Sequence, residues 1–336
     1  RILFDSSVNS LELFKTQKFY QIDISILKDL GYDVLLSNRI FDSLLFWKYD
    51  ILFSYFYRYS FFAALLAKCF GKKTYFTGGI DSLDSDYASA FNYKIQALFF
   101  KLCYWVADSC IIVSQSDLKN IFKVSSLKKK LSYSEHVINT KLFIADVPKE
   151  KIFTSIVWMG DEGNVVRKGV DKALQIFAEL KKIPEFVDYR FVIIGRKGEG
   201  EVLVRSIIDK YNLKGSVELK GEVSEEDKIN LLKQSKYYFQ LSLYEGFGLA
   251  ALEALCANNI IIHSGKGGLA NPIYKEQLLF DIDNDFDSEL LKLVNKLACF
   301  TPITSYDNLL EYYDIQRRKD DFEAIIVNGK SNYKLK

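Results

Sequence analysis

The stretch Tyr244–Asn271, YEGFGLAALEALCANNIIIHSGKGGLAN, combines two carboxylates with exposed backbone at the start of an expected helix. Glu245 and Glu253 stand eight positions apart, around Gly246 and Gly248. Glycines leave backbone N–H groups accessible to a phosphate, and a carboxylate can accept hydrogen bonds from two sugar hydroxyls. The same pattern also fits a helix that merely carries acidic residues near its positive end.

The rest of the chain alternates short apolar runs with longer helical patterns. The runs are continuous rather than alternating, which is typical of parallel strands covered on both faces, so we predict an α/β fold of doubly wound sheets. The expected strands are 2–7, 32–37, 49–54, 73–79, 109–115, 152–160, 189–196, 216–221, 237–243 and 259–264, and the expected helices include 11–30, 93–107, 170–182, 202–211, 225–234 and 250–257. Ser224 and Asp227 fit a capping box at the start of one of these helices.

The length of 336 residues predicts two domains rather than one. The alternation pauses at 144–150, IADVPKE, where we place a hinge. We therefore expect an N-terminal domain over 1–146, a C-terminal domain over 151–300, and a helical segment over 301–336 that could pack back on the N-terminal domain. Ligands of such domains bind at the carboxyl ends of the strands, so a cleft between the domains is expected to hold the site.

Composition narrows the class of protein. The formal charge of +2 makes no case for a nucleic-acid partner, and five scattered cysteines fit free thiols in a reducing compartment. The longest apolar runs are too short to span a bilayer, which needs roughly 20 residues. We expect a cytoplasmic protein that could rest on the inner face of the membrane. The aromatic and basic run 44–73 could supply that contact, although core packing is favoured about two to one.

A second segment with possible chemistry is Val157–Val170, VWMGDEGNVVRKGV. A strand is expected to end near Gly160, with a polar loop leading to Arg167 and Lys168 just before the next helix. Cations beside a helix N-terminus make an anion site, because the free N–H groups and the helix dipole add to their charge. A basic surface loop explains the segment equally well.

These segments together resemble the large retaining glycosyltransferase family with the GT-B fold, glycosyltransferase group 1, whose signature is E-x7-E. The similarity runs from about 152 to 271 and is weaker in the first half of the chain. The matching positions are Arg167, Lys168, Gly169, Val170, Asp171, Tyr244, Glu245, Gly246, Phe247, Gly248, Leu249, Glu253, Ala254, Gly267, Gly268 and Leu269.

The resemblance implies roles for individual residues. Lys168, helped by Arg167, would neutralise the leaving nucleotide diphosphate, Glu245 would face the sugar, and Glu253 would hold the ribose hydroxyls. It implies a nucleotide-diphosphate sugar as co-substrate, no further cofactor, and a glycan or lipid-linked acceptor as the second partner. No carboxylate cluster for Mg²⁺ is evident in the sequence, so we expect the lysine cation and the helix dipole to replace a metal. The further donor-binding candidates are Gly160, Gly221, Gly246, Phe247, Gly248 and Leu249.

The chain departs from the family pattern in three places. Asp161 follows Gly160, where relatives usually have arginine, so Arg167 or Arg196 would have to supply the second phosphate-binding cation. The histidine common in the first domain is replaced by FTGGIDSLDSD, where Gly79 and Asp81 are candidate contacts for the acceptor or the sugar. A structural role for Asp81, as a helix N-cap or turn residue, is slightly favoured over such a contact. Asp5-Ser6-Ser7 stands in place of the glycine-rich loop after the first strand, and the only histidines are His136 and His263.

The leading hypothesis is a retaining glycosyltransferase that acts in cell-surface polysaccharide or glycolipid synthesis. Two alternatives stay open. The first is another GT-B nucleotide-sugar enzyme, such as an epimerase or a phosphorylase. The second is a catalytically silent GT-B partner subunit, which the departures at Asp161 and in the first domain keep under consideration.

Overall fold

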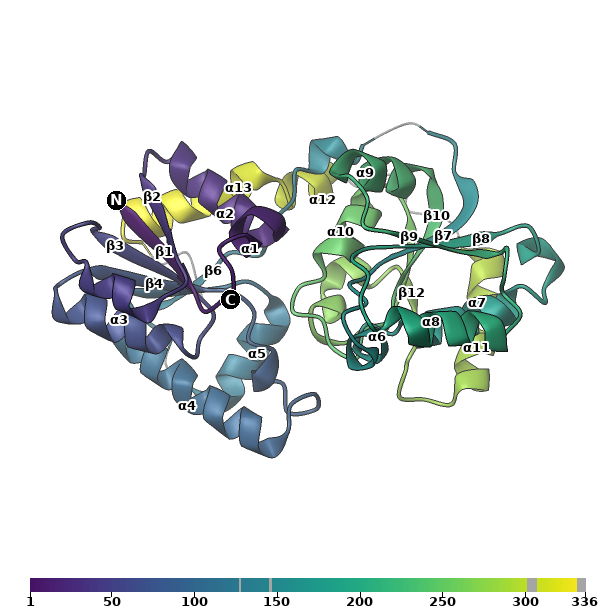
Figure 1. Ribbon diagram of the computed structural model, residues 1–336, viewed down its shortest axis with the longest axis horizontal. Helices are drawn as coiled ribbons and strands as arrows, with labels where there is room; N and C mark the ends of the chain where they lie inside the picture. The colour runs from purple at the N-terminus through teal and green to yellow at the C-terminus, as the bar shows by residue number, and fades with distance from the viewer. Residues whose placement is uncertain (127, 145–146, 301–306, 331–336) are drawn as a thin grey trace. The chain divides into compact units, whose positions relative to one another are not determined.

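The described residues of the computed structural model, 1–126, 128–144, 147–300 and 307–330, contain two parallel six-stranded sheets, each covered by helices on both faces (Figure 1). One compact unit comprises Arg1–Ile138 with the segment from Glu311 onward, and the other comprises Asn139–Leu310. The predicted hinge at 144–150 includes positions 145–146, which lie outside the described residues, as do 301–306 and 331–336 of the expected C-terminal segment.

The first unit has the strand order β2-β1-β3-β4-β5-β6, with every pairing parallel. Helices α1, α2 and α13 lie on one face, and α3, α4 and α5 on the other (Figure 1). The bounds are β1 Ile2–Ser6, α1 Leu13–Thr16, α2 Lys18–Asp29, β2 Val34–Ser37, β3 Ile51–Tyr55, α3 Ser60–Cys69, β4 Lys73–Thr77, α4 Ala90–Val106, β5 Ser109–Ile112, α5 Gln115–Val124, β6 Leu131–Tyr133, α12 Asp307–Tyr312 (which crosses the unit boundary) and α13 Ile315–Phe322.

The second unit has the strand order β12-β11-β10-β7-β8-β9, again entirely parallel. Helices α7, α8 and α11 cover one face, and α9 and α10 the other (Figure 1). The bounds are β7 Glu150–Ile156, α6 Glu162–Arg167, α7 Val170–Leu180, β8 Arg190–Ile194, α8 Glu201–Lys210, β9 Val217–Gly221, α9 Glu225–Gln234, β10 Ser235–Gln240, α10 Leu249–Cys256, β11 Ile260–His263, β12 Leu278–Leu279 and α11 Phe286–Cys299.

The predicted α/β architecture is confirmed, and each predicted strand overlaps an observed one. The sequence reading missed β6 and β12, which have only three and two residues and so carry too little apolar pattern to recognise. The predicted start of α9 is confirmed: Ser224 is its N-cap and accepts from the Asp227 backbone N–H at 3.0 Å, while the Ser224 hydroxyl donates to the Asp227 carboxylate at 2.6 Å.

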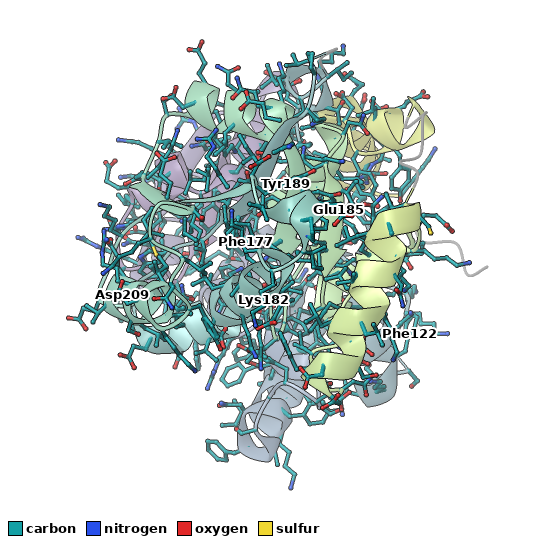
Figure 2. The ribbon with its side chains drawn as sticks, turned by 90° about the vertical axis from the view of Figure 1, so that its right-hand side faces the viewer. Phe122, Phe177, Lys182, Glu185, Tyr189 and Asp209 are labelled. Carbon is teal, nitrogen blue, oxygen red and sulfur yellow. The ribbon has the colours of Figure 1, made fainter. Side chains whose placement is uncertain are left out.

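The core of the second unit is built on stacked aromatic rings. Phe153 of β7 stacks on Tyr237 and Phe239 of the neighbouring β10, with ring centroids 4.6 and 5.1 Å away. Phe177 of α7 and Tyr189 each lie 5.5 Å from the Phe153 ring. Figure 2 labels Phe177 and Tyr189 among the side chains of this unit. Burial of these large rings, with favourable edge and offset geometry, anchors α7 against the centre of the sheet.

A buried ion pair attaches helix α13 to helix α2 of the first unit. The guanidinium of Arg318 in α13 donates to both carboxylate oxygens of Asp23 in α2 at 2.7 Å, and both side chains are almost fully buried. Tyr55 donates to the same carboxylate at 2.5 Å, and Arg318 also donates to the Ser134 and Glu135 carbonyls. Helix α13 therefore lies beside α2 as part of this unit (Figure 1).

The aromatic run 44–73 divides between the interior and the surface. Strand β3 is wholly buried, and α3 buries Phe61 with three of its alanines. Trp47, Phe62 and Phe70 remain exposed. Within the described part of the chain, no helix combines the length and the apolar character needed to cross a membrane.

Candidate active site

The two glycine groups of the quoted stretch pack against one another in the second unit. Gly248 begins α10 with φ +89°, a left-handed conformation that favours glycine. A Cβ on Gly267, where φ is +59°, would lie 2.2 Å from the Glu245 carbonyl oxygen. The Gly268 N–H donates to that same oxygen at 2.5 Å. The glycines therefore let the turn after β11 close on the backbone that carries Glu245.

Glu245 is held by three side chains. Lys168 Nζ lies 2.8 Å from Oε2 and 3.0 Å from Oε1, with both side chains largely covered. Ser242 Oγ and Gln240 Nε2 donate to Oε2 at 3.0 and 3.1 Å. These bonds fix the orientation of the Glu245 carboxylate, and the Lys168 ammonium balances its negative charge.

A polar row along β10 supports this arrangement. Tyr238, Gln240 and Ser242 follow one another at the two-residue spacing of a strand face. Tyr238 donates to Gln240 Oε1 at 3.1 Å, and Gln240 Nε2 donates to Ser242 Oγ at 2.9 Å. Burial raises the pKa of Tyr238, the hydrogen bond from the Ile156 N–H opposes that shift, and the negative charges of Glu253 and Glu245 add to it. Sequence reasoning missed this row, although its polar spacing inside an apolar strand was a usable signal.

The segment before α7 differs from the prediction. Residues 162–167 form the short helix α6, so the expected polar loop is wrong. Asp161, at the position where the family usually has arginine, is the N-cap of this helix and accepts from the Asn164 N–H at 2.6 Å. Arg167 ends α6 and donates to Asn164 Oδ1 at 2.8 Å. Arg196 lies with its guanidinium 6.0 Å from the Trp158 ring.

Lys168 reaches Glu245 because the connection between α6 and α7 is seated on the end of β10. The Leu243 N–H donates to the Arg167 carbonyl at 2.8 Å. Gly169 has φ +68°, and a Cβ there would lie 2.0 Å from the Leu241 carbonyl oxygen. Only glycine permits this approach, so the Arg-Lys-Gly order places the lysine at the carboxyl end of the strand.

Glu253 is paired with a residue that the sequence reading did not select. Lys228 of α9 lies 2.8 Å from both oxygens of the buried Glu253 carboxylate, and 3.1 Å from the more exposed Glu225. The capping box located the start of α9, and Lys228 directly follows Asp227. The capping signal does not indicate which helix packs against α10, so it could not predict that Lys228 pairs with Glu253.

The remaining predicted residues lie in several places. Phe247 is buried, Gly246 and Leu249 are half-buried beside it, and Gly160 lies against the Trp158 ring. Gly221 ends β9 with φ +76°, and its carbonyl accepts from the Gly195 N–H at 2.8 Å. The acceptor candidates Gly79 and Asp81 belong to the first unit, where Asp81 is exposed at the start of a 3-10 turn, Asp81–Leu83.

The opening of the first unit shows the consequence of its unusual residues. Asp5, at the carboxyl end of β1, is buried beside Ser54, whose hydroxyl donates to it at 3.4 Å. Burial raises the pKa of Asp5 to about 7, with Ser54 opposing and Asp42 adding to the shift. This carboxyl occupies the strand end where the family pattern has its glycine-rich loop.

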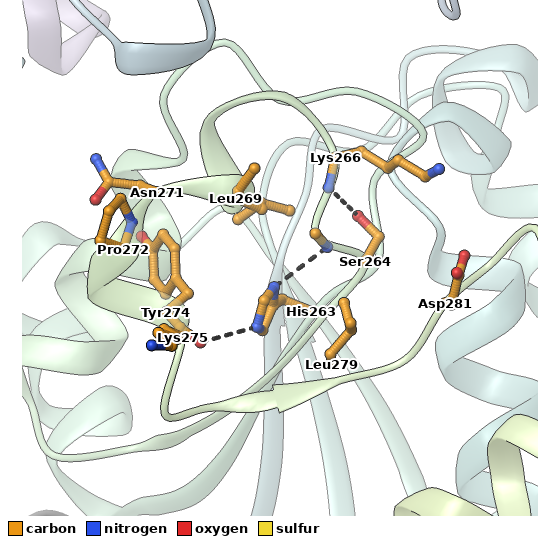
Figure 3. A pocket seen from close by; sticks show the side chains of 12 residues that line it. His263, Ser264, Lys266, Leu269, Asn271, Pro272, Tyr274, Lys275, Leu279 and Asp281 are labelled. Carbon is orange, nitrogen blue, oxygen red and sulfur yellow. Dashed lines mark hydrogen bonds between the residues drawn. The ribbon is translucent and has the colours of Figure 1, made fainter.

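A pocket of about 520 Å³ opens beside the ends of β11 and β12 (Figure 3). His263 lines it, with Nε2 3.2 Å from the Tyr274 carbonyl and Nδ1 accepting from the Gly265 N–H at 3.2 Å. Burial lowers the pKa of His263 to about 4, so the ring is neutral and bonded on both sides at neutral pH. That arrangement is structural, and the side chains of Lys168, Glu245 and Glu253 do not line this pocket. Among the described residues, no group of three or more His, Cys, Asp or Glu side chains is placed to hold a metal ion.

Solved structures resemble the chain along almost its whole length. Anabaena Alr3699/HepE in complex with UDP-glucose superposes with a TM-score of 0.73 at 13% identity, over 97% of this chain and 99% of that one. Sucrose-phosphate synthase from Thermosynechococcus elongatus gives a TM-score of 0.66 at 16% identity, over 98% and 97%. The fold is therefore that of the GT-B proteins, with two Rossmann-like domains, as predicted.

The match to a protein family lies within the second unit. The family described as Glycosyl transferases group 1 matches residues 163–297, which include Lys168, Lys228, Glu245 and Glu253. The GDP-mannose:cellobiosyl-diphosphopolyprenol alpha-mannosyltransferase of Xanthomonas oryzae pv. oryzae is 32% identical over 163 residues, 42% of this chain and 40% of that protein. The phosphatidylinositol N-acetylglucosaminyltransferase GPI3 subunit of Saccharomyces cerevisiae is 27% identical over 129 residues, 38% and 28% of the two chains. The matched part spans less than half the length of either relative.

Proposed function

We propose that the protein is a retaining glycosyltransferase that moves a sugar from a nucleotide-diphosphate sugar to a glycan or lipid-linked acceptor, on the cytoplasmic side of the membrane and in cell-surface polysaccharide or glycolipid synthesis. The observation that carries the proposal is the Lys168–Glu245 ion pair at the carboxyl end of β10, beside the glycine turn that starts α10. It lies inside the part of the chain that matches the group 1 family.

Lys168 and Glu245 could each exchange its present partner for a group of the donor when the donor binds. The donor's diphosphate would compete with Glu245 for the Lys168 ammonium, and Glu245, still held by Gln240 and Ser242, would then be able to accept a sugar hydroxyl. When the bond between the anomeric carbon and the diphosphate oxygen breaks, negative charge grows on that oxygen. A preorganised cation at this point stabilises the transition state more than the ground state.

Glu253 would serve the ribose. Its buried carboxylate is bonded through both oxygens by the Lys228 ammonium, which matches its negative charge. A carboxylate can accept hydrogen bonds from a pair of hydroxyls, and we propose that Glu253 does so from the ribose of the donor. Gly79 and Asp81 stay proposed contacts for the acceptor or the sugar.

Replacing Glu253 with glutamine should weaken donor binding by about 10- to 150-fold, since a hydrogen bond to a charged group is worth about 1.5–3 kcal/mol. Titration calorimetry with the donor measures the loss. Glu225→Gln is the matched control, because Glu225 also contacts Lys228 but is 46% exposed and has no proposed ligand. Equal donor affinity in Glu253→Gln and the parent protein would contradict the ribose role.

Transfer should continue in the presence of EDTA, because Lys168 is proposed to provide the positive charge at the leaving diphosphate. Initial rates are measured with EDTA and then with added Mg²⁺ or Mn²⁺, alongside a metal-dependent transferase that confirms effective chelation. Complete loss with EDTA and recovery with either ion would show that the metal-independent proposal is wrong.

A panel of nucleotide-diphosphate sugars, screened by thermal shift and followed by donor hydrolysis, tests the proposed function directly. Stabilisation by one donor with release of its nucleoside diphosphate supports a transferase. Stabilisation without turnover, with or without added acceptors, favours the silent partner. Conversion of the donor to another nucleotide sugar favours an epimerase.

A further inference from the structure

Helix α4 of the first unit carries a line of exposed large apolar side chains. Phe91, Leu98 and Trp105 are 72%, 56% and 68% exposed. They follow one another at intervals of seven residues, which places them on one face of the helix about 10 Å apart. We call these three residues the α4 stripe.

The opposite face of α4 is already committed to the core. Phe100, Cys103, Tyr104 and Val106 are buried in the cluster that α4 shares with α3 and the sheet. A surface helix of a soluble domain ordinarily presents polar residues outward, so an apolar outer face indicates a surface that is covered in use.

The apolar surface continues onto the neighbouring helix. Phe62 of α3 is 43% exposed, and its ring lies 6.2 Å from that of Phe99 in α4. The two helices pack side by side on the same face of the sheet (Figure 1). The exposed apolar area therefore extends across two neighbouring helices.

The charges around the α4 stripe are positive. Lys94 and Lys101 are exposed on α4 itself, and neither α3 nor α4 contains an acidic residue within its bounds. Asp84 and Asp86 precede α4, and Asp108, just beyond it, is paired with Lys68 at 3.0 Å.

More basic residues gather where the stripe ends. Lys130 Nζ donates to the Trp105 carbonyl at 2.9 Å. With Lys73 and Lys129, it lines a polar pocket of about 280 Å³. An apolar helix face flanked by lysines has the pattern of a helix that lies in the interface of an anionic bilayer.

We propose that the α4 stripe docks on a lipid bilayer that contains anionic phospholipid, with the aromatic rings at the headgroup level and the lysines on the charged heads. The sequence predicted a possible membrane contact in the run 44–73. Phe62 of that run is exposed on α3, beside the α4 stripe. The inference does not depend on sugar transfer, because lipid binding is measured with neither donor nor acceptor present.

The test is co-sedimentation of the full chain with vesicles of phosphatidylcholine alone and of phosphatidylcholine mixed with phosphatidylglycerol. Binding should be stronger to the anionic vesicles and should weaken as salt is raised. The triple variant Phe91→Ser, Leu98→Ser, Trp105→Ser should lower the partition coefficient by about tenfold or more. The control is Val202→Ser with Leu291→Ser, which changes two residues that are 70% and 63% exposed in the second unit.

A second measurement covers the case in which the triple variant folds poorly. With Trp47→Phe and Trp158→Phe, Trp105 is the only tryptophan, and its emission should shift to the blue on adding anionic vesicles. No binding to either vesicle, an unshifted Trp105, or equal partition of a folded triple variant would overturn the proposal. So would a dimer in light scattering that the triple variant abolishes, since the stripe would then be an interface between copies.

Discussion

Alanine at position 168 should lower the turnover rate by about 10²–10³-fold, as removal of one preorganised group that stabilises developing charge does in other active sites. The connection between α6 and α7 is hydrogen-bonded to the chain just after β10, and it places the Lys168 ammonium against Glu245. We propose that this ammonium also binds the leaving diphosphate. The free energy of unfolding should change by only about 1–2 kcal/mol, because Gln240 and Ser242 still bond the Glu245 carboxylate.

The rate is measured with one confirmed donor, and stability by chemical denaturation. Lys182→Ala is the matched control, since Lys182 also pairs with a glutamate but is 70% exposed. Arg167→Ala should lower the turnover rate less than Lys168→Ala does. The exception would be that Arg167 supplies the phosphate-binding cation that relatives have at the position of Asp161. Near-normal turnover in Lys168→Ala would remove the main chemical support for transfer and favour the silent partner.

Replacing Arg318 with alanine should destabilise the first unit by about 3–5 kcal/mol, because it leaves the buried Asp23 carboxylate without its cation. The change would also remove the Arg318 donor from the Ser134 carbonyl, whereas the Glu135 carbonyl still accepts from Arg317 at 2.9 Å. Chemical denaturation measures the loss. Arg317→Ala is the control, because Arg317 is partly exposed and pairs with Asp321 within its own helix.

The double variant Asp23→Leu with Arg318→Met separates the cost of an unpaired charge from the value of the pair. Removing both charges should recover most of the stability that Arg318→Ala loses, since a buried ion pair can often be replaced by apolar side chains at little cost. A loss of less than about 1 kcal/mol in Arg318→Ala would show that the pair does not hold α13 in place.

Much of the fold followed from local pattern. The continuous apolar runs predicted the parallel strands, and Ser224 with Asp227 predicted the start of α9, because both signals depend on neighbours within a few residues. The strands β6 and β12 were not predicted because they are too short to show an apolar pattern. We predicted a loop at 162–167 because the helix there has only six residues, too few to show a helical period.

The sequence alone determined the α/β class, the candidate residues Lys168, Glu245 and Glu253, and the glycines around them, because residue order and spacing within each of two short segments carry that information. Only the tertiary structure decided their partners. Lys168 lies 77 positions from Glu245, Lys228 lies 25 from Glu253, and Arg318 lies 295 from Asp23. Charge pairing across such separations depends on which helix packs on which strand. That choice is made by burial of the whole chain at once, so no local pattern encodes it.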